Sequence, residues 1–214
     1  MVSLHVDALK KVYDRKIIFQ DVSLSLSPSE WLAITGANGS GKSTLLKILA
    51  AQASATSGTV RYLLDGTALT PDATRPHIGF VSPYLNFYEE LSGIENVSFA
   101  LRAKGKPIFK RELDELFDYF RLSDAQSKRV KAYSSGMVQR LRFIQAFASK
   151  PKFLFLDEPT ATLDDDGKVL FWNKLNQFIS QTLVVIASND HDDIAHCTSQ
   201  LCIEAFKPTK KILS

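Results

Sequence analysis

The stretch Gly36-Ala37-Asn38-Gly39-Ser40-Gly41-Lys42-Ser43-Thr44 fits the pattern G-x-x-x-x-G-K-[ST] at every fixed position. The apolar run Trp31–Thr35 predicts a strand before it, and Thr44–Leu49 predicts the start of a helix after it. Glycines let backbone N–H groups point at phosphate oxygens, and a helix N-terminus adds partial positive charge. In this context the pattern predicts that the whole run surrounds the phosphates of a nucleotide, with Lys42 at the β- and γ-phosphates and Ser43 bound to Mg²⁺.

The composition is that of an ordinary globular protein, with 45% hydrophobic and 23% charged residues among 214, and we expect one domain spanning 1–214. The 26 basic residues nearly balance 23 acidic ones, which argues against nucleic acid as a partner. We expect neither a signal peptide nor a membrane span, because no apolar run is long enough. Cys197 and Cys202 lack a second pair to complete a four-ligand metal site, so we expect free thiols in a reducing compartment.

Short apolar runs, separated by helical patterns, predict the fold class. Runs of this kind that are bounded by polar or turn residues are typical of buried parallel strands. Together with the phosphate loop, these runs predict an α/β fold, a P-loop nucleoside triphosphatase (NTPase) core with a mostly parallel sheet and an antiparallel β subdomain. The expected strands are Leu4–Val6, Val22–Leu26, Trp31–Thr35, Val60–Leu64 (entering an Asp65-Gly66 turn), Ile78–Val81, Phe153–Leu156 and Leu183–Ala187.

A helical segment is expected between the Ile78–Val81 and Phe153–Leu156 strands. Leu113, Leu116, Phe117 and Phe120 follow the i, i+3, i+4, i+7 spacing of an amphipathic helix, with charged residues filling the opposite face. We interpret residues 88–133 as a helical subdomain inserted into a core formed by residues 1–87 and 134–214.

Two acids, Asp157 and Glu158, end the apolar strand Phe153–Leu156. At a strand end beside the phosphate loop, Asp157 can hold Mg²⁺ directly or through water. Glu158 can then polarise an attacking water as general base. The alternative for Glu158 is an acid favoured by the positive end of a following helix.

The order of these motifs points to a known family. The phosphate loop is followed by the helical insert, by Tyr133-Ser134-Ser135-Gly136-Met137-Val138-Gln139-Arg140, and by Leu156-Asp157-Glu158-Pro159-Thr160-Ala161-Thr162-Leu163-Asp164. This order resembles the ATP-binding cassette (ABC) ATPase family across essentially the whole chain. The second segment resembles that family's LSGGQ signature, in a variant common among exporter-type members.

The resemblance implies a composite site formed by two chains. Ser134, Ser135 and Gly136 would form an anion-binding helix terminus for the γ-phosphate of ATP held by the opposite subunit. An ATP-dependent dimer is implied, either a homodimer or a pair with a paralogous cassette, and Asp164 would lie in the loop that crosses its interface. Tyr13 matches the aromatic residue that stacks on adenine; a half-buried strand aromatic is the alternative.

The resemblance further implies an ATPase that powers a separate integral-membrane permease, with export as the expected direction. Such a subunit would be cytoplasmic and peripheral, on the inner face of the membrane through its permease. The alternative is a soluble ABC ATPase without transport, for example in iron–sulfur cluster assembly.

Two positions depart from the family's pattern. Pro83 or Tyr84 stands where the family usually has a glutamine that senses Mg²⁺, although Asn86 lies nearby as a partial substitute. Asn189 stands where the family usually has a histidine at the γ-phosphate, and we expect it to act there. His191, two residues further on, is expected to be a surface residue. Nucleotide binding should survive both changes, whereas hydrolysis should be slower or differently gated.

Overall fold

A parallel sheet of five strands forms the centre of the molecule in the computed structural model, which describes residues 1–27, 30–178 and 181–208. All four strand pairings in it are parallel. The predicted run Leu183–Ala187 is confirmed residue for residue, and the run from Phe153 extends by one residue. In spatial order the strands are β6 (Ile78–Val81), β7 (Phe153–Asp157), β8 (Leu183–Ala187), β3 (Trp31–Thr35) and β9 (Ser199–Cys202).

A second, antiparallel sheet has the order β2-β1-β4-β5. Its first hairpin is much longer than the short runs expected at Leu4–Val6 and Val22–Leu26. The pairing of β1 with β2 is irregular near Ala8 and Asp21, which both have positive φ. Such bulges interrupt the alternation of polar and apolar residues by which a strand is recognised in a sequence, so only parts of the two strands were predicted. The bounds are β1 (Val2–Tyr13), β2 (Lys16–Leu26), β4 (Ser57–Leu64) and β5 (Thr67–Ala68), and the expected turn at Asp65-Gly66 is present.

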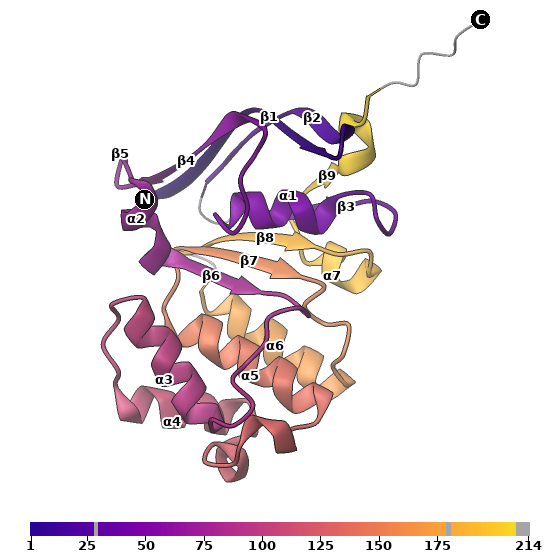
Figure 1. Cartoon of the computed structure of the whole chain (residues 1–214). Helices are drawn as coiled ribbons and strands as arrows, with labels where there is room; N and C mark the ends of the chain where they lie inside the picture. Colours follow the sequence, from indigo (N-terminus) through magenta and orange to yellow (C-terminus); the bar gives the residue numbers. More distant parts are fainter. Residues whose placement is uncertain (28–29, 179–180, 209–214) are drawn as a thin grey trace, which may run out of the picture.

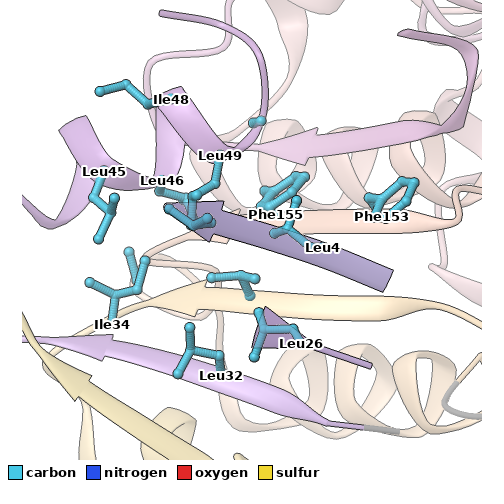
Figure 2. Packing of buried hydrophobic residues seen from close by; sticks show 14 of the residues in the cluster. Leu4, Leu26, Leu32, Ile34, Leu45, Leu46, Ile48, Leu49, Phe153 and Phe155 are labelled. Carbon is cyan, nitrogen blue, oxygen red and sulfur yellow. The ribbon is translucent and has the colours of Figure 1, made fainter. Parts of the chain in front are cut away.

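The first long helix, α1 (Lys42–Leu49), lies between the two sheets (Figure 1). Residues of β7 alternate between two hydrophobic clusters, as the period of a strand requires. Phe153 and Phe155 belong to the hydrophobic cluster that also contains Leu45 and Leu46 of α1 and residues of the antiparallel sheet, and Figure 2 shows Leu4 of that sheet beside Phe155. Leu154 and Leu156 face the opposite cluster, which the other long helices supply. The parallel sheet is therefore covered on both faces.

Four long helices cover the other face of the parallel sheet (Figure 1). They are α3 (Gly93–Ala103), α4 (Lys110–Tyr119), α5 (Ser135–Ala148) and α6 (Asp165–Asn176). The predicted apolar stripe is confirmed: Leu113, Phe117 and Phe120 are buried, and Leu116 is partly buried against the same cluster. Phe120, at the end of α4, stacks on Phe147 of α5 with 6.0 Å between ring centroids. No helix in the described ranges is long and apolar enough to cross a membrane.

Shorter elements complete the chain, and the sequence did not indicate them. In residues 1–27, 30–178 and 181–208 they include two short α-helices and four single turns of 3₁₀-helix. The helices are α2 (Pro71–Thr74) and α7 (His191–Ala195), and the 3₁₀ turns are Arg75–His77, Ser123–Ala125, Val130–Ala132 and Ile203–Phe206.

Because the central strands are parallel, their carboxyl ends meet at one edge of the sheet, the edge at which open α/β sheets bind ligands. The phosphate loop follows β3 at this edge, and Asp157 ends β7. Ser82 follows β6, and Ser188 follows β8. The topology thus gathers four chain segments that lie far apart in the sequence.

Candidate nucleotide site

The phosphate loop has the backbone that its glycines predict. Gly36, Gly39 and Gly41 have φ values of 139°, 75° and 116°, a region that residues with a Cβ rarely adopt. A Cβ on Gly41 would also lie 2.6 Å from a methyl carbon of Ile18 in β2. The loop then enters α1 directly at Lys42.

Lys42 is almost fully buried, with 6% of its surface exposed. Its Nζ donates to the backbone oxygen of Gly36 at 2.8 Å and to that of Ala37 at 3.4 Å. The ammonium group is therefore held inside the loop by neutral acceptors, and it has no carboxylate partner in the described ranges.

Glu204 contacts the phosphate loop, and the sequence did not indicate this contact. Its carboxylate accepts a hydrogen bond from the backbone N–H of Ala37 at 2.6 Å and one from the thiol of Cys202 at 3.3 Å. The bond from Ala37 lowers the pKa of Glu204. No sequence motif marks Glu204, because it reaches the loop only through the pairing of β9 with β3. Cys202 and Cys197 are both free thiols.

Ser43 and Asp157, the predicted metal ligands, are brought together. The Ser43 hydroxyl donates to Asp157 Oδ1 at 2.8 Å, and Asp157 is 1% exposed. Ser82, a further residue that the sequence did not reveal, donates to Asp157 Oδ2 at 3.2 Å. Hydroxyl and carboxylate oxygens suit Mg²⁺, which commonly takes one or two protein ligands and completes its shell with water and phosphate oxygens. These residues therefore fit that ion.

The segment after β6 runs outward from Ser82. Tyr84 is exposed, and Lys47 Nζ lies 5.4 Å from its ring centroid. Arg142 of α5 donates to the backbone oxygen of Pro83 at 2.8 Å, so this loop is tied to the helical layer. Asn86 is exposed in the same loop.

Glu158 lies next to Asp157 with φ at 44°, in the left-handed region that non-glycine residues rarely adopt. Its backbone N–H donates to the backbone oxygen of Ala187 at 2.8 Å, and its carboxylate accepts a hydrogen bond from Ser188 at 3.1 Å. Burial raises the pKa of Glu158, while Ser188 and Lys42 act in the opposite direction. A half-buried carboxylate with a raised pKa is suited to accept a proton.

Asn189 reaches the phosphate loop, where its side-chain Nδ2 donates to Asn38 Oδ1 at 3.0 Å. His191 is the first residue of α7 and is exposed, as predicted.

The signature segment lies beside the loop that contains Asp164. Ser134 caps α5 by accepting a hydrogen bond from the N–H of Met137 at 3.2 Å, and Asp164 caps α6. Arg140 joins the two helices through a 2.9 Å ion pair with Asp164. Ser134 and Ser135 are exposed and Gly136 is half-buried; within the described ranges, no hydrogen bond joins them to the phosphate loop.

Tyr13 ends β1 at the first hairpin and is 48% exposed, with Lys11 Nζ 4.5 Å from its ring centroid. No hydrogen bond or ring interaction joins Tyr13 to the phosphate loop in the part of the chain that the structure describes, and its role at adenine stays a prediction.

The family model described as ABC transporter matches residues 19–161, which include the phosphate loop, the signature segment and Glu158. The chain belongs to the ABC transporter family. It is 32% identical to the ABC transporter ATP-binding protein YxlF of Bacillus subtilis (strain 168), over 93% of this chain and 65% of that protein. It is 33% identical to the lipoprotein-releasing system ATP-binding protein LolD 1 of Chlorobium chlorochromatii (strain CaD3), over 84% of this chain and 76% of that protein.

A solved structure of the ATP-binding subunit of an ABC transporter superposes on this chain with a TM-score of 0.81 at 25% identity. The match covers 94% of this chain and 85% of that one. The two-sheet arrangement is thus that of ABC ATP-binding subunits, and members of this family bind ATP.

Proposed function

We propose that this chain hydrolyses MgATP as the motor of an ABC transporter and drives export through a permease that is a separate polypeptide. The proposal rests on the convergence of Lys42, the Ser43–Asp157 pair and Glu158 at one edge of the sheet. Phosphate binding, metal binding and orientation of the attacking water are the tasks that phosphoryl transfer to water requires.

In this proposal the phosphate loop from Gly36 to Thr44 binds the triphosphate through its backbone N–H groups. The Nζ of Lys42 exchanges the backbone oxygens of Gly36 and Ala37 for phosphate oxygens. Ser43 and Asp157 hold Mg²⁺, which stabilises the developing negative charge when bound.

Glu158 is the proposed general base. Its raised pKa favours proton uptake from water, and its contact with Ser188 fixes one of its two carboxylate oxygens. Asn189 is proposed to contact the γ-phosphate, because its bond to Asn38 already places it at the loop.

We further propose that two cassettes close on two ATP molecules, as a homodimer or with a paralogous chain. Ser134, Ser135 and Gly136 would bind the γ-phosphate held by the opposite cassette. This agrees with the absence, in the described ranges, of a hydrogen bond between them and their own phosphate loop. Asp164, exposed next to this segment, would lie at the same interface. Tyr13 is proposed to stack on adenine.

Three exposed aromatic side chains support contact with a membrane permease. Tyr84, Tyr88 and Phe99 are 76%, 59% and 51% exposed, and they belong to the loop after β6 and to α3. Tyr88 and Phe99 meet edge to face at 5.3 Å. Large exposed apolar groups that cluster in this way are typical of binding surfaces. We propose that residues 88–133 form the inserted helical subdomain that transmits movement from the site to the permease at the inner face of the membrane.

The direction of transport is the finer part of the proposal. The chain resembles LolD 1, whose name describes the release of lipoproteins, and also SsuB of Bacillus subtilis (28% identical), whose name describes import. The exporter-type form of the segment at Ser134 is the feature that favours export.

The test is purification of the chain from native membranes in mild detergent, followed by identification of bound proteins and an ATPase assay. We expect a polytopic permease to co-purify in amounts similar to the chain. Substrate movement out of the cell should depend on Lys42, with Lys42→Ala as the inactive control. Recovery of soluble partners alone would refute the transport function and favour the alternative of a soluble ABC ATPase.

A further inference from the structure

Ser188, the residue between β8 and Asn189, lies between two carboxylates and is fully buried. Its Oγ is 2.7 Å from Oδ2 of Asp193 and 3.1 Å from Oε2 of Glu158. The backbone N–H of Asp190 donates to the same Oγ at 3.1 Å. Three polar groups therefore surround one hydroxyl.

The contacts of Ser188 with Glu158 and Asp193 can both be hydrogen bonds only if these side chains hold one more proton than they do with both carboxyl groups ionised. A serine hydroxyl has one proton to donate, whereas an ionised carboxylate can only accept. If Glu158 and Asp193 were both ionised, Ser188 could donate to only one of them, and the other contact would join two acceptors. Such a contact between buried oxygens is unfavourable. One of the two carboxyl groups must therefore be protonated for both contacts to be hydrogen bonds.

The surroundings of Asp193 identify it as the group that holds this proton. Asp193 is 1% exposed, and its other oxygen, Oδ1, accepts a hydrogen bond from the Thr160 hydroxyl at 2.8 Å. The thiol of Cys197 donates to its backbone oxygen. The positive charge of Lys168 lowers the pKa of Asp193, but Lys168 lies 3.9 Å from Asp190, whose negative charge acts in the opposite direction.

The other candidate for this proton, Glu158, is only half-buried and feels the positive charge of Lys42. Burial also raises the pKa of Asp193, in the same direction as the geometric argument.

We propose that Asp193 is a positioning residue for hydrolysis, whose protonated carboxyl group donates to Ser188 so that Ser188 donates to Glu158. This proposal rests on the assignment of Glu158 as general base. With these donors the Ser188 hydroxyl has a complete set of partners. It donates one hydrogen bond to Glu158, and its oxygen accepts one from Asp193 and one from the backbone N–H of Asp190. It fixes Oε2 of Glu158 and leaves the second oxygen for water.

The direct test is infrared difference spectroscopy of the purified chain at neutral pH without nucleotide, comparing the parent with Asp193→Asn. We expect the parent to show the carbonyl stretch of a protonated carboxylic acid, shifted in D₂O and absent from Asp193→Asn. Glu158→Gln should keep the band, because Gln can still accept from Ser188. The absence of a difference band would show that Asp193 is ionised, and loss of the band in Glu158→Gln would place the proton on Glu158. Either result overturns the proposal.

The kinetic test uses the conservative variant as a rescue. An asparagine can donate through its amide to Ser188 and accept from Thr160, so Asp193→Asn should keep kcat within about twofold of the parent. Asp193→Ala and Ser188→Ala should lower kcat about fivefold to tenfold, the effect of one lost hydrogen bond, with KM for ATP unchanged. Asp192→Asn, which changes an exposed acid on the same short helix, is the matched control and should behave as the parent.

An equal loss in Asp193→Asn and Asp193→Ala, with unchanged thermal unfolding, would refute the positioning role. If neither the parent nor any variant hydrolyses ATP, the proposed function fails. The infrared band still tests Asp193 in that case, so the two failures are distinguishable.

Discussion

Replacement of Asn189 by histidine should raise the rate of ATP hydrolysis. Asn189 lies at the phosphate loop, where its Nδ2 is 3.0 Å from Asn38 Oδ1, and we have proposed that a side chain at this position contacts the γ-phosphate. An amide donates a neutral hydrogen bond, whereas a protonated imidazole donates a charge-assisted one that is roughly twice as strong. If a neutral bond contributes about 1 kcal/mol, the gain in transition-state stabilisation is about 1 kcal/mol, or roughly fivefold in rate.

The bond to Asn38 has little influence on this estimate. It is exposed and joins two neutral groups, so its net contribution is at the low end, about 0.5 kcal/mol. The histidine variant loses this bond, and Asn189→Ala loses it as well without adding an imidazole. The alanine variant is therefore the matched control, and we expect it to hydrolyse ATP more slowly than the parent.

The effect of pH makes the prediction specific. An exposed histidine has a pKa of about 6.5, so the charge is present below that pH and is lost as the pH rises. Acid also lowers the rate, because Glu158 must be ionised to act as a base. Since the pKa of Glu158 is raised, the parent rate should begin to fall at a higher pH than it would with an ordinary glutamate. The ratio of variant to parent rates at one pH removes that common effect.

The assay is steady-state phosphate release at saturating MgATP, at pH values of about 6 and about 8, together with a nucleotide-binding titration. We expect the ratio of Asn189→His to parent to be roughly five or above at the acid pH and closer to one at the alkaline pH. A ratio at or below one at the acid pH would refute the reasoning. It would show that the asparagine already suits this site or that the loop at Pro83 limits turnover.

Three further predictions test the remaining parts of the site. Lys42→Ala should weaken ATP binding about tenfold to a hundredfold in calorimetry with circular dichroism unchanged, and unchanged affinity would contradict the phosphate-loop assignment. Glu158→Gln should bind ATP but accumulate ATP-dependent dimers in size-exclusion chromatography, because an amide cannot accept the proton of water; full ATPase activity would exclude it as the base. Ser134→Arg should prevent dimer formation while the monomer still binds ATP, and an equal loss of monomer binding would refute a site shared between two chains.

Much of the fold followed from local patterns in the sequence. The phosphate loop was predictable because its glycines and Lys42 serve a backbone conformation that few other residues allow. The strand Leu183–Ala187 was predictable because it is buried on both faces and so is continuously apolar. Edge strand β9, Ser199–Cys202, was missed because it is largely exposed and carries no apolar run.

The supporting residues of the site were not predictable for a different reason. Ser82, Ser188 and Asp193 make hydrogen bonds to Asp157, Glu158 and Thr160, which lie in segments far from them in the chain. Single serines or aspartates near strand ends and turns are common, so none of them stands out in the sequence. The rule that parallel strands end at one edge could have singled out Ser82 and Ser188, because both directly follow strands that the sequence did predict. The burial of Asp193 depends on how α7 packs, and no local pattern reveals it.

The hydrogen bond from Ala37 to Glu204 bears on how the protein acquires its site during synthesis. The first turn of the phosphate loop is held by a residue 167 positions later, and β3 is flanked by β8 and β9, which are synthesised long after it. Contacts of such long sequence separation form late, because the intervening chain must be ordered first. A ribosome-bound chain that ends before β9 carries the complete nucleotide motif without that strand and without Glu204. The phosphate loop therefore gains this support only after the ribosome has synthesised Glu204.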